Sequence, residues 1–170
     1  MTTLYVDNIA PNLQSKISAP NLTLPTGSVV QVVSASFADQ KTDVTSSGTF
    51  TNTHITADIT PSSSSNKILA LINTVVSVDA TNTTFRYLRL GRDATTITAT
   101  EKVIRSSYQS TSGSDVIDFS LHHLDSPSST SSITYSLMAD AAGQGMAVGG
   151  RMSNTGANGL STITLMEIAG

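Results

Sequence analysis

Two adjacent histidines, His122 and His123, lie among carboxylates and are the residues best suited to hold a metal ion. Asp118 precedes them, Asp125 follows, and imidazole and carboxylate groups are common metal ligands. Apolar and polar residues alternate here, which predicts a β-strand, so the two histidines point to opposite faces. His122 shares a face with Asp118, which gives two ligands where three or four are needed. We expect no metal and no cofactor, although one histidine per chain beside a three-fold axis could supply three ligands.

The isolated carboxylates and the many serines indicate catalysis no more strongly than the two histidines indicate a metal site. Asp79, Asp93, Glu101 and Asp140 each lie near the end of a predicted strand. A glycosidase needs two carboxylates at a defined separation, and its cleft usually has aromatic platforms, yet the chain has no Trp and four Tyr. A serine hydrolase needs a nucleophile elbow, and no Gly-x-Ser-x-Gly motif is present. The sequence therefore predicts that the protein is not an enzyme.

The glycine-rich residues 143–150 do not form a phosphate-binding loop, because no predicted helix follows them. We expect these glycines to mark a β-bulge or a subunit contact. The net charge is −3 and no stripe of Lys and Arg is present, so we expect no nucleic-acid partner. No stretch is apolar enough to predict membrane insertion. Without cysteine, and without a basic and then apolar N-terminus, synthesis in a cytoplasm is expected.

Most of the chain alternates apolar residues with Ser and Thr, which together account for 51 of the 170 residues. Period-two alternation predicts strands with one buried and one wet face. Residues 67–79 are apolar on both faces, which places them in the middle of a sandwich or at a subunit contact. The pattern predicts an all-β fold, a single jelly-roll-like β-sandwich of eight or nine antiparallel strands. The strands are expected at residues 28–37, 49–60, 67–79, 83–90, 95–99, 101–108, 116–124, 131–139 and 161–168, with a two-residue hairpin turn at 158–159.

The first 25 residues differ from the remainder, with three prolines and irregularly spaced apolar residues. A stretch this apolar and without a period is not typical of a solvated tail, although a disordered leader with one short strand is the alternative. We predict two parts: a docking arm at residues 1–25 and a β-sandwich domain at 26–170. The arm residues expected to bury against a neighbouring surface are Leu4, Tyr5, Val6, Ile9, Leu13 and Ile17.

Two pairs of segments carry a resemblance to a known group of proteins. Residues 4–9 (Leu-Tyr-Val-Asp-Asn-Ile) and 24–33 resemble the start of small virion proteins of marine tailed bacteriophages. Residues 59–69 and 154–168 are similar to segments of phage tail-fibre heads and related particle-surface proteins. The resemblance covers most of the chain. It implies a homotrimeric β-sandwich on a phage particle, with no catalytic residues. The long shaft of such fibres is missing, because the arm leads directly into the predicted sandwich.

We therefore expect a virion structural protein, made in the host cytoplasm, that contacts other virion proteins of the tail or capsid. The first hypothesis is a short tail fibre or knob that binds a receptor. A capsid decoration or cement protein is the second, and a stand-alone carbohydrate-binding module is the third. The polar loops 125–132 and 151–159 are expected to face outward and could contact a cell-surface glycan. Their candidate residues are Asp125, Ser128, Asn154 and Asn158.

Overall fold

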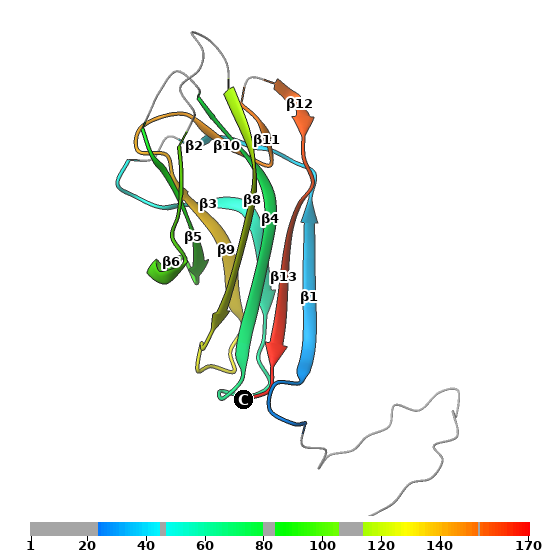
Figure 1. Cartoon of the computed structure of the whole chain (residues 1–170). Coiled ribbons are helices and arrows are strands. Elements are labelled where there is room, and N and C mark those ends of the chain that lie inside the picture. Colours follow the sequence, from blue (N-terminus) through cyan, green and yellow to red (C-terminus); the bar gives the residue numbers. More distant parts are fainter. Residues whose placement is uncertain (1–23, 45–46, 80–83, 106–113, 153) are drawn as a thin grey trace, which may run out of the picture.

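A computed structural model describes residues 24–44, 47–79, 84–105, 114–152 and 154–170. These residues form two antiparallel β-sheets packed face to face (Figure 1), so the predicted all-β sandwich is confirmed. The only helical element among them is a single 3-10 turn, η1 (Thr98–Thr100). The six residues of the predicted arm given above lie outside the described residues.

The first sheet, called sheet A here, contains the longest strand at its centre. β4 (Lys67–Asp79) pairs along its whole length with β8 (Ser114–Asp125), and on its other side it pairs first with β13 and then with β10. β1 pairs with β13, and β2 pairs with β10. The central position predicted for residues 67–79 is thus confirmed. The remaining strands of sheet A are β1 (Val29–Phe37), β2 (Lys41–Val44), β10 (Met146–Val148) and β13 (Ser161–Ile168).

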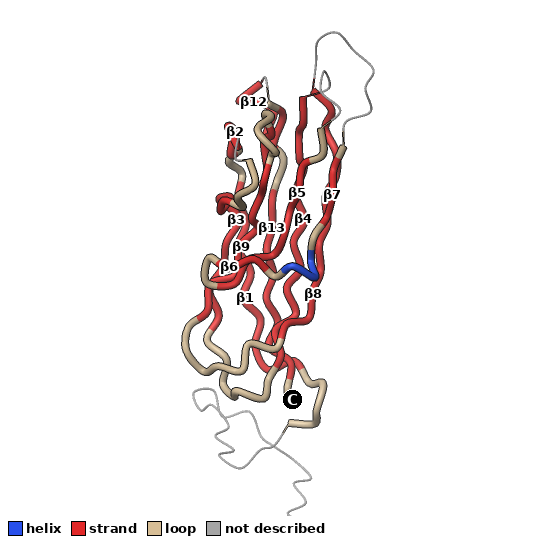
Figure 2. Tube along the Cα trace, turned by 90° about the vertical axis from the view of Figure 1, so that its left-hand side faces the viewer, coloured by secondary structure: helices blue, strands red, loops and turns tan. Residues whose placement is uncertain are grey.

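The second sheet, sheet B, packs its inner face against sheet A (Figure 2). β9 pairs with β3 on one side and with β5 on the other, and β5 also pairs with two short strands. A separate two-stranded ribbon joins β11 and β12. The strands of sheet B and of the ribbon are β3 (Thr51–Ile59), β5 (Arg86–Arg92), β6 (Thr95–Thr96), β7 (Lys102–Ile104), β9 (Ile133–Asp140), β11 (Gly150–Arg151) and β12 (Asn154–Asn158).

The core lies between the sheets and is built by period-two alternation. In β4 the buried side chains are at even positions, among them Ile68 and Ile72, with Ser77 as an exception, and in β13 they include Ile163 and Leu165. The intervening residues therefore point away from the core.

The sandwich is elongated, and both ends of the described chain lie at one pole (Figure 1). Gly27 donates to the carbonyl of Ala169, which joins the start of β1 to the end of β13. The loops 60–66 and 126–132 lie at this same lower pole. The β11–β12 ribbon and the loop 141–145 lie at the opposite, upper pole. A chain that enters at the lower pole thus projects the upper pole away from its point of entry.

Strand prediction fails where the elements are short. The loop expected after residue 37 contains β2, and the glycine-rich stretch contains β10. The strand expected at 95–99 is two residues of β6 followed by η1. The turn at 158–159 does not form a two-residue hairpin, because β12 pairs with β11 whereas β13 pairs with β1 and β4. These short strands depend on neighbours from distant parts of the chain, which no local pattern shows.

Candidate recognition surface

The outer face of sheet A is a broad surface of mainly uncharged side chains. Because the alternate side chains fill the core, four strands present a second row of residues on the far side. These residues are mainly hydroxyl-bearing and aliphatic. They are Val32, Ser34 and Ser36 of β1, Thr162, Thr164, Met166 and Ile168 of β13, Leu69, Leu71, Asn73 and Val75 of β4, and Asp118, Ser120, His122 and Leu124 of β8.

A continuous apolar row crosses this face near the lower pole. Val32 pairs with Met166, Met166 with Leu69, and Leu69 with Leu124, so the row spans four strands. Its two ends are well exposed, at 55% for Val32 and 47% for Leu124. Leu71 is the next outward-facing residue of β4 after Leu69, and it extends this apolar surface toward the upper pole.

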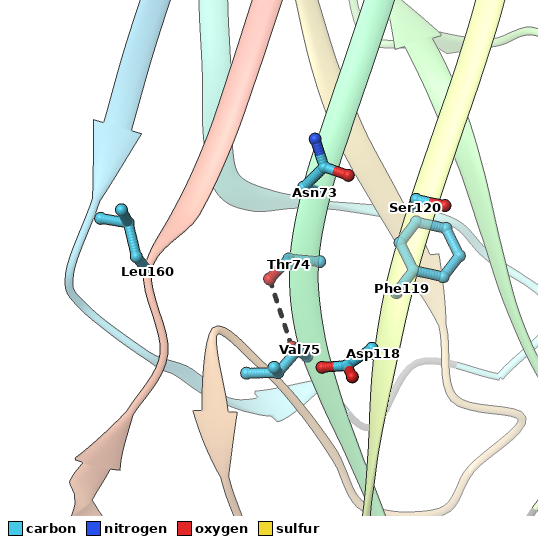
Figure 3. Close-up of a pocket in the computed structure, with 7 residues that line it drawn as sticks. All are labelled: Asn73, Thr74, Val75, Asp118, Phe119, Ser120 and Leu160. Carbon is cyan, nitrogen blue, oxygen red and sulfur yellow. Dashed lines mark hydrogen bonds between the residues drawn. The ribbon is translucent and has the colours of Figure 1, made fainter.

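A shallow depression of about 330 Å³ lies on the same face, near the middle of β4 and β8 (Figure 3). Asn73 and Val75 of β4 line it beside Asp118 and Ser120 of β8, and Leu160 stands at its other side. Leu160 is 66% exposed. The hydroxyls of Thr74 in β4 and Ser161 in β13 share a buried 2.7 Å hydrogen bond, which joins these two strands beneath the depression.

The residues that line the depression have the chemistry of weak binding. An amide, a carboxylate and a hydroxyl beside two aliphatic side chains can hydrogen-bond a polyhydroxylated ligand or receive an aliphatic side chain.

His122 and Asp118 share the outer face of sheet A, as the alternation predicts, and His123 is on the opposite face. Among the described residues, no group of three or more His, Cys, Asp and Glu side chains is arranged to hold a metal ion.

The four candidate residues of the outward loops do not share one surface. Asp125 is wrongly assigned to an exposed loop, because it ends β8 and is buried. Ser128 is exposed but lies at the lower pole, beside the entry of the chain, whereas the exposed Asn158 lies at the upper pole. Asn154 begins β12, and its side chain is outside the described set. The two loops therefore cannot face outward together from an anchor at one pole.

Asp125 is buried because it closes the sandwich at the lower pole. Its carboxylate accepts hydrogen bonds from Arg92 Nη1 of β5 at 2.7 Å and from the Tyr135 hydroxyl of β9 at 2.6 Å. Both donors belong to sheet B, so the carboxylate bridges the two sheets. Burial, and then the hydrogen bond to Asp125, raise the pKa of Tyr135 well above its usual range. For Arg92, burial alone would lower the pKa, but the bond to Asp125 outweighs it and the pKa is raised.

A second buried carboxylate, Glu167 of β13, was missed by the sequence reasoning. It accepts hydrogen bonds from Asn66 Nδ2 and Gln31 Nε2, both at 2.6 Å, and from the Ser62 backbone N–H and hydroxyl, both at 2.7 Å. Burial alone would raise the pKa of Glu167, but these bonds outweigh it and the pKa is lowered. The alternation gives a signal, because Glu167 has the parity of the core residues Ile163 and Leu165.

A third polar group, Arg86 of β5, is buried at the upper half of the sandwich. Its side chain has the parity of Leu88 and Leu90, and its Nη1 donates to the carbonyl of Thr84 at 2.7 Å. Burial lowers the pKa of Arg86, and the charge of Asp79 opposes that shift. Asp125 and Glu167 with their hydrogen-bond partners stabilise the lower pole of the sandwich, and the outer face of sheet A remains the candidate for recognition.

The comparisons add no relative to this picture. No family model matches the chain, and no curated protein is significantly similar to it. None of the helical residues that the structure describes forms a segment long and apolar enough to cross a membrane.

Proposed function

We propose that this protein is a non-catalytic structural component of a bacteriophage particle, a β-sandwich appendage of the tail that assembles as a trimer and is anchored by its N-terminal arm. One observation supports this most directly. The described chain enters the elongated sandwich at the lower pole, where its C-terminus also lies. An anchor that precedes Leu24 would hold the lower pole against the particle and present the upper pole to the surroundings.

The strand order is a second argument, and it concerns the finer type of the fold. The long strands run β1-β13-β4-β8 in sheet A and β3-β9-β5-β7 in sheet B. We propose that these eight strands are those of a jelly roll, which is a fold used by viral capsid and lectin domains. A fold does not by itself give a function, so this supports the class and not the position on the particle.

The composition of the arm fits an anchor. Residues 4–17 contain several large apolar side chains, and full burial of one such side chain is worth roughly 1.5–3 kcal/mol. Three arms of one trimer would act together, because attachment of the first raises the effective concentration of the others.

Immunogold electron microscopy of purified particles, with an antibody against this chain, tests the proposal. Label at the tail supports a receptor-binding appendage, and label over the capsid shell supports a decoration protein. No label on any particle overturns both. Deletion of residues 1–20 tests the anchor, because normal incorporation of the truncated chain into particles would contradict it.

A stand-alone carbohydrate-binding module is the second candidate, favoured by the depression on sheet A. Asn73, Asp118 and Ser120 offer hydrogen bonds suited to sugar hydroxyls. Binding of the purified chain to a glycan array, lost in the Asp118→Ala variant, would favour this function.

A further inference from the structure

We propose that copies of this chain assemble with one another through the outer face of sheet A. The inference rests on the multi-copy appendage proposed above and names the surface and the partner, which is a second copy of the same chain.

The distribution of exposed apolar side chains points to this face. Single exposed apolar residues are ordinary on a protein surface, but contiguous patches mark interaction sites. The row of Val32, Met166, Leu69 and Leu124 is contiguous across all four strands. In the upper half of sheet A, Val116 of β8 is 51% exposed, so apolar side chains extend beyond the row.

The near absence of charge on this face favours a copy of the same chain as the occupant. Among the fifteen outer-face residues named above, Asp118 is the only Lys, Arg, Asp or Glu, and Lys67 at the lower margin has the opposite charge. Two such faces do not repel each other, although the whole chain has a net charge of −3. The Ser, Thr and aliphatic side chains of this face can pack against those of neighbouring copies in the proposed trimer.

The outer face of sheet B provides a contrast within the same molecule. Its charged groups are already paired, since Arg89 binds Glu101 and also lies over the ring of Phe50. Asp58 of β3 accepts a hydrogen bond from the Thr134 hydroxyl of β9. The outer face of sheet B thus carries more charge than the outer face of sheet A, where Asp118 is the only charged residue of the fifteen named above.

The size of the outer face of sheet A is that of an interface. Four strands spaced about 4.8 Å apart, over ten residues that rise about 3.3 Å each, give a projected area of roughly 600 Å². Each partner in a standard stable interface buries about 800 Å² of its accessible surface. A pleated face exposes more than its projected area, so this face alone can supply most of an interface.

Light scattering coupled to size-exclusion chromatography tests the proposal, with variants that add one charge to an exposed position. Val32→Glu and Leu124→Glu alter the two exposed ends of the row. Val103→Glu is the matched control, because Val103 of β7 in sheet B is 52% exposed, close to the 55% of Val32. Circular dichroism establishes that each variant is folded, and two test positions on different strands allow for a variant that does not fold.

We expect the wild-type chain and Val103→Glu to elute as the same oligomer, and Val32→Glu and Leu124→Glu to elute as monomers. A monomeric wild-type chain, folded test variants that stay assembled, or a loss of assembly equal in Val103→Glu would overturn the proposal. The result is independent of the particle labelling. A monomeric chain found on particles would contradict this inference and the proposed trimer but not the location on a particle, and an assembled chain absent from all particles would contradict only the virion proposal.

Discussion

Tyr135 in β9 of sheet B donates a 2.6 Å hydrogen bond to the carboxylate of Asp125, which ends β8 in sheet A. Arg92 binds the same carboxylate oxygen from β5. The bond from Tyr135 joins the two sheets at the lower pole, and both of its partners are buried. Since a buried carboxylate is costly unless it is hydrogen-bonded, its donors determine the stability of this end of the sandwich.

Replacement of Tyr135 by Phe removes one donor and keeps the ring. We expect the free energy of unfolding to fall by about 2 kcal/mol, which is the usual contribution of a hydrogen bond to a charged group. Urea denaturation of the variant and the wild type measures this. Tyr87→Phe is the control, because the hydroxyl of Tyr87 makes no hydrogen bond to a described residue; an equal loss there would contradict the assigned role of the bond.

The raised pKa of Tyr135 predicts a loss of stability at alkaline pH. Below pH 10, the ordinary pKa of tyrosine, the hydroxyl is protonated in both the folded and the unfolded state. Above pH 10 the unfolded chain loses this proton first, so the free energy of unfolding falls by about 1.4 kcal/mol per pH unit for this group. Denaturation curves at increasing pH should show a shallower decline in Tyr135→Phe than in the wild type. Parallel declines would exclude this origin.

Glu167 predicts the opposite dependence at acidic pH. Its lowered pKa means that the carboxylate contributes stability above its ordinary value of 4.5, and this contribution is lost as the pH falls through the lower folded value. In Glu167→Gln, the new amide N–H group faces donors that need an acceptor. We expect a loss of at least about 2 kcal/mol at neutral pH and a weaker loss of stability on acidification. Denaturation between neutral and acidic pH measures both.

Glu101→Gln is the matched control for Glu167→Gln. Glu101 pairs with Arg89 at the surface, where a salt bridge contributes about 1 kcal/mol or less. If the two variants were equally stable, the buried network around Glu167 would not have the role assigned to it.

Gly27 and Gly149 have nearly the same positive φ angle, so their alanine variants distinguish the cost of backbone strain from the cost of a steric contact. Gly27 has φ +89° and free space where a Cβ would stand, whereas a Cβ at Gly149, with φ +87°, would lie 2.6 Å from the carbonyl oxygen of Asp39. Gly27→Ala should cost only the left-handed strain of about 1–2 kcal/mol. Gly149→Ala should cost clearly more, because the backbone beside β10 would also have to move. Thermal unfolding of both variants compares them, and equal shifts would refute the close approach.

The alternation in the sequence predicts the fold. The prediction fails where side chains that are far apart in the sequence meet in the structure. Residues 67–79 and 161–168 are recovered as strands with the observed bounds, because the first segment is apolar on both faces and the second alternates over its whole length. The parity that makes Ile163 buried also applies to Glu167, but its partners come from the loop 60–66 and from Gln31 of β1, all more than a hundred residues earlier. The apolar row on the outer face of sheet A could not be predicted from the sequence for the same reason. Val32, Met166, Leu69 and Leu124 become one row only through the register of three strand pairs.

The absence of cysteine allows a direct test of the proposed orientation, in which the lower pole faces the particle. Ser128 at the lower pole and Asn158 at the upper pole are both exposed, so Ser128→Cys and Asn158→Cys each provide one site for a bulky maleimide. If the arm anchors the lower pole, the label at position 128 should reduce binding of the purified chain to particles that lack it, because the label stands between the sandwich and the particle. The label at position 158 should leave that binding unchanged. The reverse result would place the upper pole against the particle and contradict the proposed orientation.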